Sequence, residues 1–139
     1  MRILALDLGT VRIGLAISDP LGYTAQGLET LQVVSKQKTL DALVKICRER
    51  EVSEIVVGLP VNMNGTMGPK ANEIFDWVKK IEEATGLLVK TWDERLTSRE
   101  AGRLMVDQGL SRQKQKSHSD RLAATLILQN YLESKRTRT

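Results

Sequence analysis

The sequence has very few of the residues that usually bind structural metals or form disulfides. Its 139 residues include a single cysteine, Cys47, and a single histidine, His118. One cysteine cannot form an intramolecular disulfide, and the lack of a Cys/His cluster argues against a structural zinc site. Any bound metal ion would therefore need oxygen ligands.

Long apolar segments are also missing from the sequence. No apolar run approaches the roughly 20 residues that a membrane-spanning helix requires, and Asp7 interrupts the opening run MRILAL before a signal-peptide core could form. Aromatic residues make up 4% of the chain, hydrophobic residues 41% and charged residues 27%, as in an ordinary globular protein. We therefore expect a cytoplasmic protein without a membrane partner, with one domain over residues 1–139.

Basic residues are concentrated in the last third of the chain. Residues 1–94 contain 11 Lys/Arg and 13 Asp/Glu, whereas residues 95–139 contain 10 and 4, so the second part carries a net charge of +6. Such asymmetry often marks a surface that binds phosphates, because lysine and arginine release the counterions condensed on nucleic acid. We expect nucleic-acid contact within residues 95–121, and we interpret residues 134–139, SKRTRT, as a basic flexible tail.

Hydrophobic periodicity predicts the element order βββ-α-β-α-β-α-α. Residues 2–8 and 12–18 are β-type runs joined by a tight turn at Gly9, and residues 25–33 could continue the meander. The later elements are a helix after the N-cap Ser35, a strand over 54–60, a helix from Pro69 to about Ala84 with Gly86 just past its end, a strand over 87–92, a helix from Thr97 to about Gly109, and a helix from about Ser117 to Glu133. Residues 110–119 lack apolar periodicity, so we expect a loop there. The order predicts an α/β fold with a mixed sheet covered by helices.

Three regions of the sequence place carboxylates where they would be buried or would meet a ligand. Asp7 interrupts a strand that otherwise reads as buried, and an unpartnered buried carboxylate is costly. Asp93 and Glu94 end the strand over 87–92, where α/β sheets commonly bind ligands. Asp120 shares a helix face with Ala124, Ile127 and Tyr131. A shared site for Mg²⁺ or Mn²⁺ would relieve all three burial costs, although Asp7 could instead accept amide hydrogen bonds from its turn, and the other acids could be solvated.

Four ordered motifs resemble those of the YqgF/RuvX family. They are ALDLGTVRIGLAISD at 5–19, VVGLPVNMNGTMG at 56–68, DERLTSREA at 93–101 and SDRLAATLILQNYL at 119–132. The resemblance implies an RNase H-like fold whose five-stranded mixed sheet has its first three strands antiparallel and the others parallel. It also implies a metal-dependent endonuclease that processes the 5′ end of precursor 16S rRNA, with Asp7, Glu94 and Asp120 as a catalytic triad that binds two Mg²⁺ or Mn²⁺ ions. A fourth acid has no clear counterpart, and Asp93 or Asp19 could serve.

Several basic residues could bind the nucleic acid around such a centre. We predict this role for Arg12, Arg95, Arg112, Lys114 and Lys116, although solvated cations are common on any surface. His118, two residues before Asp120, could assist proton transfer or could simply be exposed.

Other functions remain open from the sequence. The DLGT motif at 7–10 also resembles the phosphate loop of the actin, sugar-kinase and chaperone ATPases, but those proteins need two lobes and this chain supplies one. A Holliday junction resolvase acting on four-way DNA and a nucleic-acid-binding factor with little turnover are the remaining alternatives. The sequence does not decide between a monomer and a homodimer.

Overall fold

A computed structural model of the chain describes the backbone of residues 2–59, 68–93 and 112–137, and it describes the side chains of these residues except 112–121 and 136–137. The elements are β1 (Arg2–Leu8), β2 (Arg12–Ser18), β3 (Ala25–Gln32), α1 (Lys36–Glu49), β4 (Val52–Leu59), α2 (Pro69–Thr85), β5 (Leu88–Asp93) and α4 (Arg112–Thr137). The helix expected over 97–109 lies outside the described residues. No helix in the described part of the chain is both long and apolar enough to cross a membrane.

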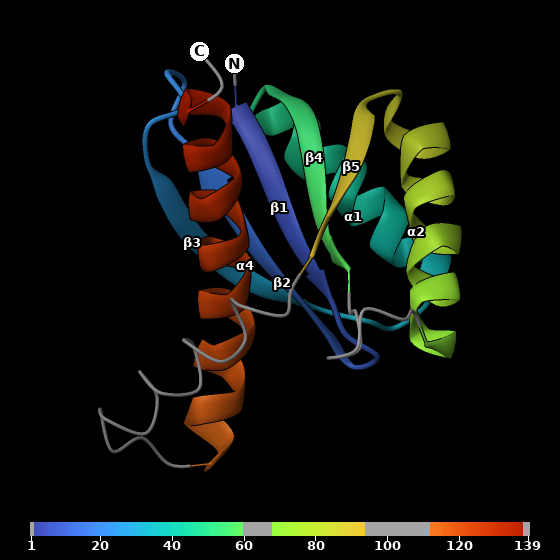
Figure 1. The fold of residues 1–139 in the computed structure, drawn as a ribbon. Coiled ribbons are helices and arrows are strands. Elements are labelled where there is room, and N and C mark those ends of the chain that lie inside the picture. The colour runs from blue at the N-terminus through green and yellow to red at the C-terminus, as the bar shows by residue number, and fades with distance from the viewer. Residues whose placement is uncertain (1, 60–67, 94–111, 138–139) are drawn as a thin grey trace.

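The strands form one mixed sheet in the order β3-β2-β1-β4-β5. β1 pairs antiparallel with β2, and β2 pairs antiparallel with β3. β4 is parallel to β1, and β5 is parallel to β4. The predicted antiparallel meander followed by parallel strands is therefore confirmed. Because β1, β4 and β5 run the same way, their carboxyl ends lie together at one edge of the sheet, at the bottom of Figure 1.

Helices cover both faces of the sheet, with α4 on one side and α1 and α2 on the other (Figure 1). The side chains of β1 alternate between two separate hydrophobic cores. Leu4, Leu6 and Leu8 pack toward α1 and α2, whereas Ile3 and Ala5 pack with residues of α4. Strand alternation therefore determines on which face of the sheet each side chain of β1 lies.

The ends of α1 and α2 follow the signals that the sequence predicted. The Ser35 hydroxyl accepts a hydrogen bond from the amide of Lys38 at 3.1 Å, which caps α1. Pro69 occupies the first turn of α2, and Gly86 ends it in the left-handed conformation with φ of 71°. Local chemistry thus fixes the bounds of both helices.

The prediction for residues 110–119 was wrong where the structure describes them, because α4 begins at Arg112 rather than near Ser117. Arg112, Lys114 and Lys116 therefore lie on a helix and not in a loop. The segment RQKQK has no apolar stripe, but arginine, glutamine and lysine all have high helix propensity and no glycine or proline interrupts them. The later turns of α4 pack against the sheet, and a helix stabilised in this way can extend through residues that have no apolar stripe of their own.

At its other end α4 continues past the expected Glu133 to Thr137. Lys135, in the segment expected as a flexible tail, contacts the sheet through an ion pair with Glu54 at 2.8 Å. The hydroxyl of Tyr131 donates a hydrogen bond to the same carboxylate, and Lys90 lies 3.6 Å from it. We call Glu54, Lys90, Tyr131 and Lys135 the α4 anchor, because these residues tie the helix to β4 and β5.

Candidate active site

Asp7 lies near the carboxyl end of β1, half-buried, on the face of the sheet that α4 covers. It follows Ile3 and Ala5 in the strand alternation, so its side chain projects to the same side as theirs. Among the described residues, no amide of the adjoining turn and no basic side chain bonds to its carboxylate. The alternative that Asp7 accepts amide hydrogen bonds from its turn is therefore not supported by the described residues.

Glycines flank Asp7 on both neighbouring strands, a feature that the sequence analysis missed. Gly14 of β2 is its antiparallel partner. Leu6 pairs with Val57, so the next residue pair in the parallel register is Asp7 with Gly58 of β4. Glycine inside a strand often marks a place where a ligand approaches the backbone. Neither of these two strand partners carries a side chain beside the carboxylate.

Trp92 extends the same row to β5, because it pairs with Gly58. It faces α4, where its ring meets that of Tyr131 edge-on with centroids 5.8 Å apart. Asp93 is the last residue of β5 and points to the opposite face by strand alternation. Glu94, which follows directly, lies outside the described residues, as does Arg95.

The backbone of α4 brings Asp120 to the level of Asp7. Ala124, Ile127 and Tyr131 are all buried against the sheet, so position 120 belongs to the sheet-facing side of the helix. Tyr131 contacts Glu54, which is the partner of Ile3. From there β1 advances about 13 Å to Asp7 at roughly 3.3 Å per residue. Running the opposite way (Figure 1), α4 covers about 16 Å back to Asp120 at roughly 1.5 Å per residue.

Neither residue considered as a fourth acid joins Asp7. Asp19 follows β2, whose carboxyl end lies beside the amino end of β1, at the opposite edge of the sheet. Its carboxylate accepts hydrogen bonds from the amides of Thr24 and Tyr23 at 2.8 and 2.7 Å. These bonds hold the pKa of Asp19 below its ordinary value, and the bond from Thr24 has the largest effect. Asp93 faces away from α4. Among the described side chains, no group of three His, Cys, Asp or Glu residues could hold a metal ion. The side chains of Glu94 and Asp120 are not described, so this finding does not cover them.

Arg12 is the predicted basic residue whose side chain the structure places. It begins β2, is half-buried, and shares the α4-covered face with Gly14 and Ala16 by alternation. A phosphate held at Asp7 would therefore lie close to a guanidinium. Arg112, Lys114, Lys116 and His118 lie in the first turns of α4, where only the backbone is described.

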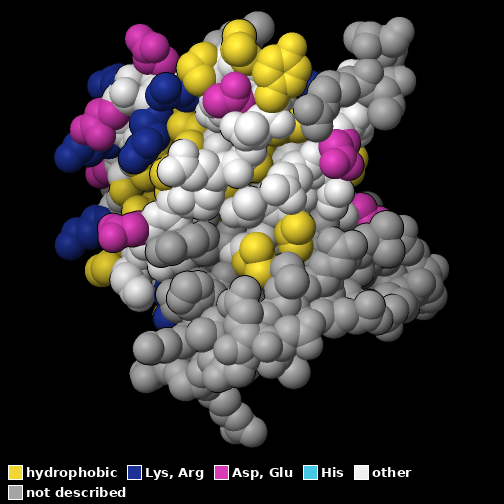
Figure 2. All heavy atoms as spheres, turned by 90° about the vertical axis from the view of Figure 1, so that its left-hand side faces the viewer, with side chains coloured by type: hydrophobic (Ala, Val, Ile, Leu, Met, Phe, Trp, Pro, Cys, Tyr) yellow, Lys and Arg dark blue, Asp and Glu magenta, His cyan; other side chains and the backbone are white. Residues whose placement is uncertain are grey.

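The face of the molecule shown in Figure 2 carries charges of both signs where its residues are described. Figure 2 shows lysine and arginine side chains interspersed with acidic ones along its left side, and hydrophobic side chains gathered at the top. Where residues are described, this face therefore has no extended patch of a single charge.

Solved structures of two junction resolvases share this fold. Thermus thermophilus RuvC in complex with a Holliday junction substrate matches with a TM-score of 0.61 and 14% identity, covering 98% of this chain and 96% of that one. A complex of the Fowlpox virus resolvase with Holliday junction DNA matches with a TM-score of 0.60 and 13% identity, covering 97% and 99%. At such identities the likeness concerns the fold alone, and it confirms the predicted RNase H-like architecture.

Sequence relatives are much closer. A Clostridium botulinum protein (strain Alaska E43 / Type E3) named "Putative pre-16S rRNA nuclease" is 51% identical over 133 residues, which cover 96% of this chain and 97% of that protein. Its namesake from Clostridium botulinum strain Hall is 50% identical over 134 residues, covering 96% and 98%. The family described as RuvX, Holliday junction resolvase, matches residues 1–134. The chain therefore belongs to the RuvX family.

Proposed function

We propose that this protein is a metal-dependent endonuclease that hydrolyses phosphodiester bonds in precursor 16S rRNA. The observation that carries the proposal is the position of Asp7, a half-buried carboxylate between Gly14 and Gly58 at the carboxyl edge of the sheet. Membership of the RuvX family supports nuclease chemistry. The names of relatives that are about half identical favour rRNA as the substrate. Synthesis of that precursor in the cytoplasm would place the protein there.

Asp7, Glu94 and Asp120 are the proposed ligands of two Mg²⁺ or Mn²⁺ ions. The fit rests on the donor set, since carboxylate oxygens suit these ions, and on the two glycine partners of Asp7, which place no side chain beside its carboxylate. When bound, such ions lower the pKa of the attacking water and stabilise charge on the leaving oxygen. A carboxylate on a central strand is held rigidly, which this chemistry requires of its ligands.

The protein's own cations would position the substrate. Arg12 lies on the same face as Asp7, where its planar guanidinium can pair with a phosphate. Arg95, Arg112, Lys114 and Lys116 would add contacts along the strand, with a binding strength that falls as salt rises. Asp120 and the basic residues of the first turns of α4 share one helix, so the helix that completes the metal site would also bind the backbone of the substrate.

The proposal is tested by cleavage of end-labelled precursor 16S rRNA with Mg²⁺ or Mn²⁺. We expect the wild type to cut and Asp7→Asn to lose at least about a hundredfold in rate while retaining binding, because the amide cannot replace a charged ligand. Asp76→Asn, a change of an exposed acid on α2, is the matched control and should cut like the wild type. Normal cutting by Asp7→Asn would remove this residue from the centre.

A four-way DNA junction is the second candidate substrate, favoured by the family description. It would be offered in the same assay, since both substrates present phosphodiesters to the same residues. Symmetric cutting of a junction needs two active sites, so its detection would call for a homodimer. Binding of both substrates without cutting under either metal would instead favour a nucleic-acid-binding factor.

A further inference from the structure

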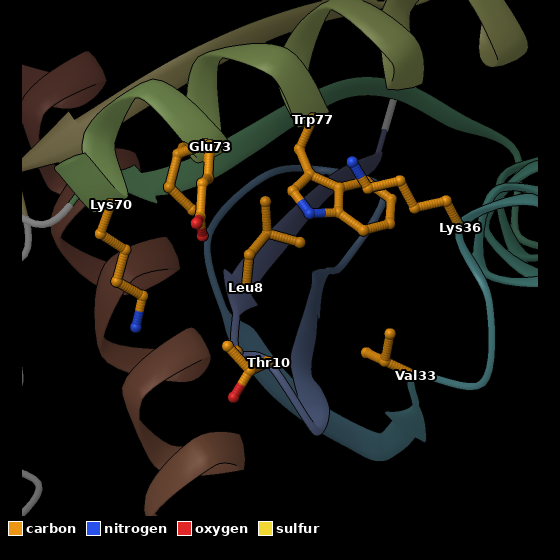
Figure 3. A pocket seen from close by; sticks show the side chains of 9 residues that line it. Leu8, Thr10, Val33, Lys36, Lys70, Glu73 and Trp77 are labelled. Atoms are coloured by element: carbon orange, nitrogen blue, oxygen red, sulfur yellow. The ribbon is translucent and has the colours of Figure 1, made fainter.

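A second site lies at the same edge of the sheet, on the face opposite Asp7. A cavity of about 180 Å³ opens where β1 ends and α1 and α2 begin. Figure 3 shows Lys70, Glu73 and Trp77 projecting into it from α2 toward Leu8 and Thr10. Leu8 follows Asp7 directly, and strand alternation sends the two side chains to opposite faces.

The walls of this pocket combine an aromatic ring with two cations. Trp77 is half-buried, and the ammonium group of Lys36 lies 5.7 Å from its ring centroid. Lys70 stands on the other side of the opening and is exposed, as is Lys36 (Figure 3). A flat apolar wall with flexible cations at its rim is the arrangement by which proteins bind single-stranded nucleic acid, through base stacking and phosphate contacts.

The carboxylate of Glu73 argues against a pocket that binds only an anion. This carboxylate lines the pocket beside the two lysines, so a ligand that was mostly phosphate would meet repulsion as well as attraction. Adenine, cytosine and guanine avoid this cost, because their exocyclic amines can donate a hydrogen bond to a carboxylate. The pocket therefore fits a unit that carries both a base and a phosphate.

A tight turn connects the pocket to the proposed cleavage centre. The amide of Gly9 donates to the carbonyl oxygen of Arg12 at 3.0 Å, which fixes Thr10 and Val11 between the two sites. Val11 is 56% exposed, so it adds apolar surface along the path. A nucleic-acid strand that crosses this turn would reach Asp7 on one face of the sheet and Trp77 on the other face.

We propose that the pocket formed by Lys36, Lys70, Glu73 and Trp77 binds one nucleotide of a single-stranded segment next to the bond that is cut. The base lies against Trp77, and Lys36 and Lys70 each contact one of the two phosphates that flank it. This inference rests on the proposed nuclease function. It assigns to the protein a substrate with an unpaired segment beside the cleavage position.

The test measures binding without cleavage, so that it stands apart from the nuclease assay. Fluorescence anisotropy follows a labelled single-stranded RNA of about ten nucleotides on the Asp7→Asn protein without metal. Lys36→Gln/Lys70→Gln should weaken binding about ten- to thirtyfold at 0.1 M salt and reduce the salt slope by about 1.4, as expected for two lost phosphate contacts. The control Lys45→Gln/Lys79→Gln removes one exposed lysine from each of the same helices and should change binding less than threefold.

A second readout reports the aromatic contact directly. The chain has two tryptophans, so in a Trp92→Phe background the remaining fluorescence comes from Trp77, and the RNA should quench it with the affinity found by anisotropy. Equal weakening by both lysine pairs, or unchanged Trp77 fluorescence at saturation, would overturn the proposal. Release of the RNA by inorganic phosphate as readily as by a mononucleotide would reduce the pocket to an anion site. Binding that meets these expectations in a protein that never cuts would instead refute the nuclease function and leave the pocket standing.

Discussion

The α4 anchor yields a stability prediction that can be worked out from its contacts. Tyr131→Phe removes only the hydroxyl that donates to Glu54, while the ring keeps its edge-on contact with Trp92. A hydrogen bond to a charged group contributes about 1.5–3 kcal/mol. Since Lys135 and Lys90 still neutralise the carboxylate, we expect the lower part of that range, about 1.5–2 kcal/mol, in urea unfolding at pH 7. The melting temperature should fall by roughly 5–8 °C.

The pH dependence of this loss follows from the state of Glu54. Burial alone would raise the pKa of this carboxyl, but hydrogen bonds from Lys135 and Tyr131 and the charges of Lys135 and Lys90 outweigh burial and hold it below the ordinary value of 4.5. A lowered pKa means that the stabilisation is complete above pH 4.5 and is lost as pH falls through the lowered value. The difference between wild type and Tyr131→Phe should therefore shrink as the pH falls from 4.5 through the lowered pKa of Glu54.

Tyr23→Phe is the matched control, because Tyr23 is 60% exposed in the β2–β3 connection and should change stability by less than about 0.5 kcal/mol. Equal losses for the two variants at pH 7 would refute the assignment of the anchor. A Tyr131→Phe loss that stayed constant while Glu54 became protonated at acid pH would show that the hydroxyl does not act through a charged Glu54.

Three further expectations concern single residues. Gly9→Ala would place a Cβ 2.4 Å from the carbonyl oxygen of Arg12, so urea unfolding should show a loss of about 2 kcal/mol, and unchanged stability would contradict the tight turn. Burial raises the pKa of the Cys47 thiol to about 11, so a thiol reagent at pH 8 should label it only after denaturation; fast labelling of native protein would contradict its core position. Asp7→Asn should melt at the same or a higher temperature in metal-free buffer, since the described residues give its carboxylate no partner, and a clear fall would reveal one.

Local signals in the sequence predicted the elements whose ends are chemically marked. Ser35, Pro69 and Gly86 act on the backbone within a few residues of themselves, so their effect is visible without the rest of the fold. Short strands predicted an antiparallel meander in the same way, because tight turns leave no other pairing. The position of Asp7 in a buried strand could likewise be predicted from the sequence, since one polar residue interrupts an apolar run.

Features that depend on distant pairing could not be predicted from the sequence. Gly14 and Gly58 frame Asp7 only because two different strands pair with β1 in a particular register. The α4 anchor joins Glu54 to Lys135 across 81 positions of the chain. The early turns of α4 escaped prediction for another reason, because helix propensity rather than an apolar stripe carries the helix through them.

The register of β1 gives the two proposed sites a fixed relation. Asp7 and Leu8 are consecutive, so one strand end would supply the proposed metal ligand on one face and part of the proposed nucleotide pocket on the other. A slip of one residue would exchange these faces and put a leucine where the carboxylate is needed. Because the turn closed by Gly9 and Arg12 is short, the nucleotide held at Trp77 would lie at a constant distance from the cut bond. The position of cleavage would then be measured from a bound unpaired nucleotide rather than read from an extended sequence.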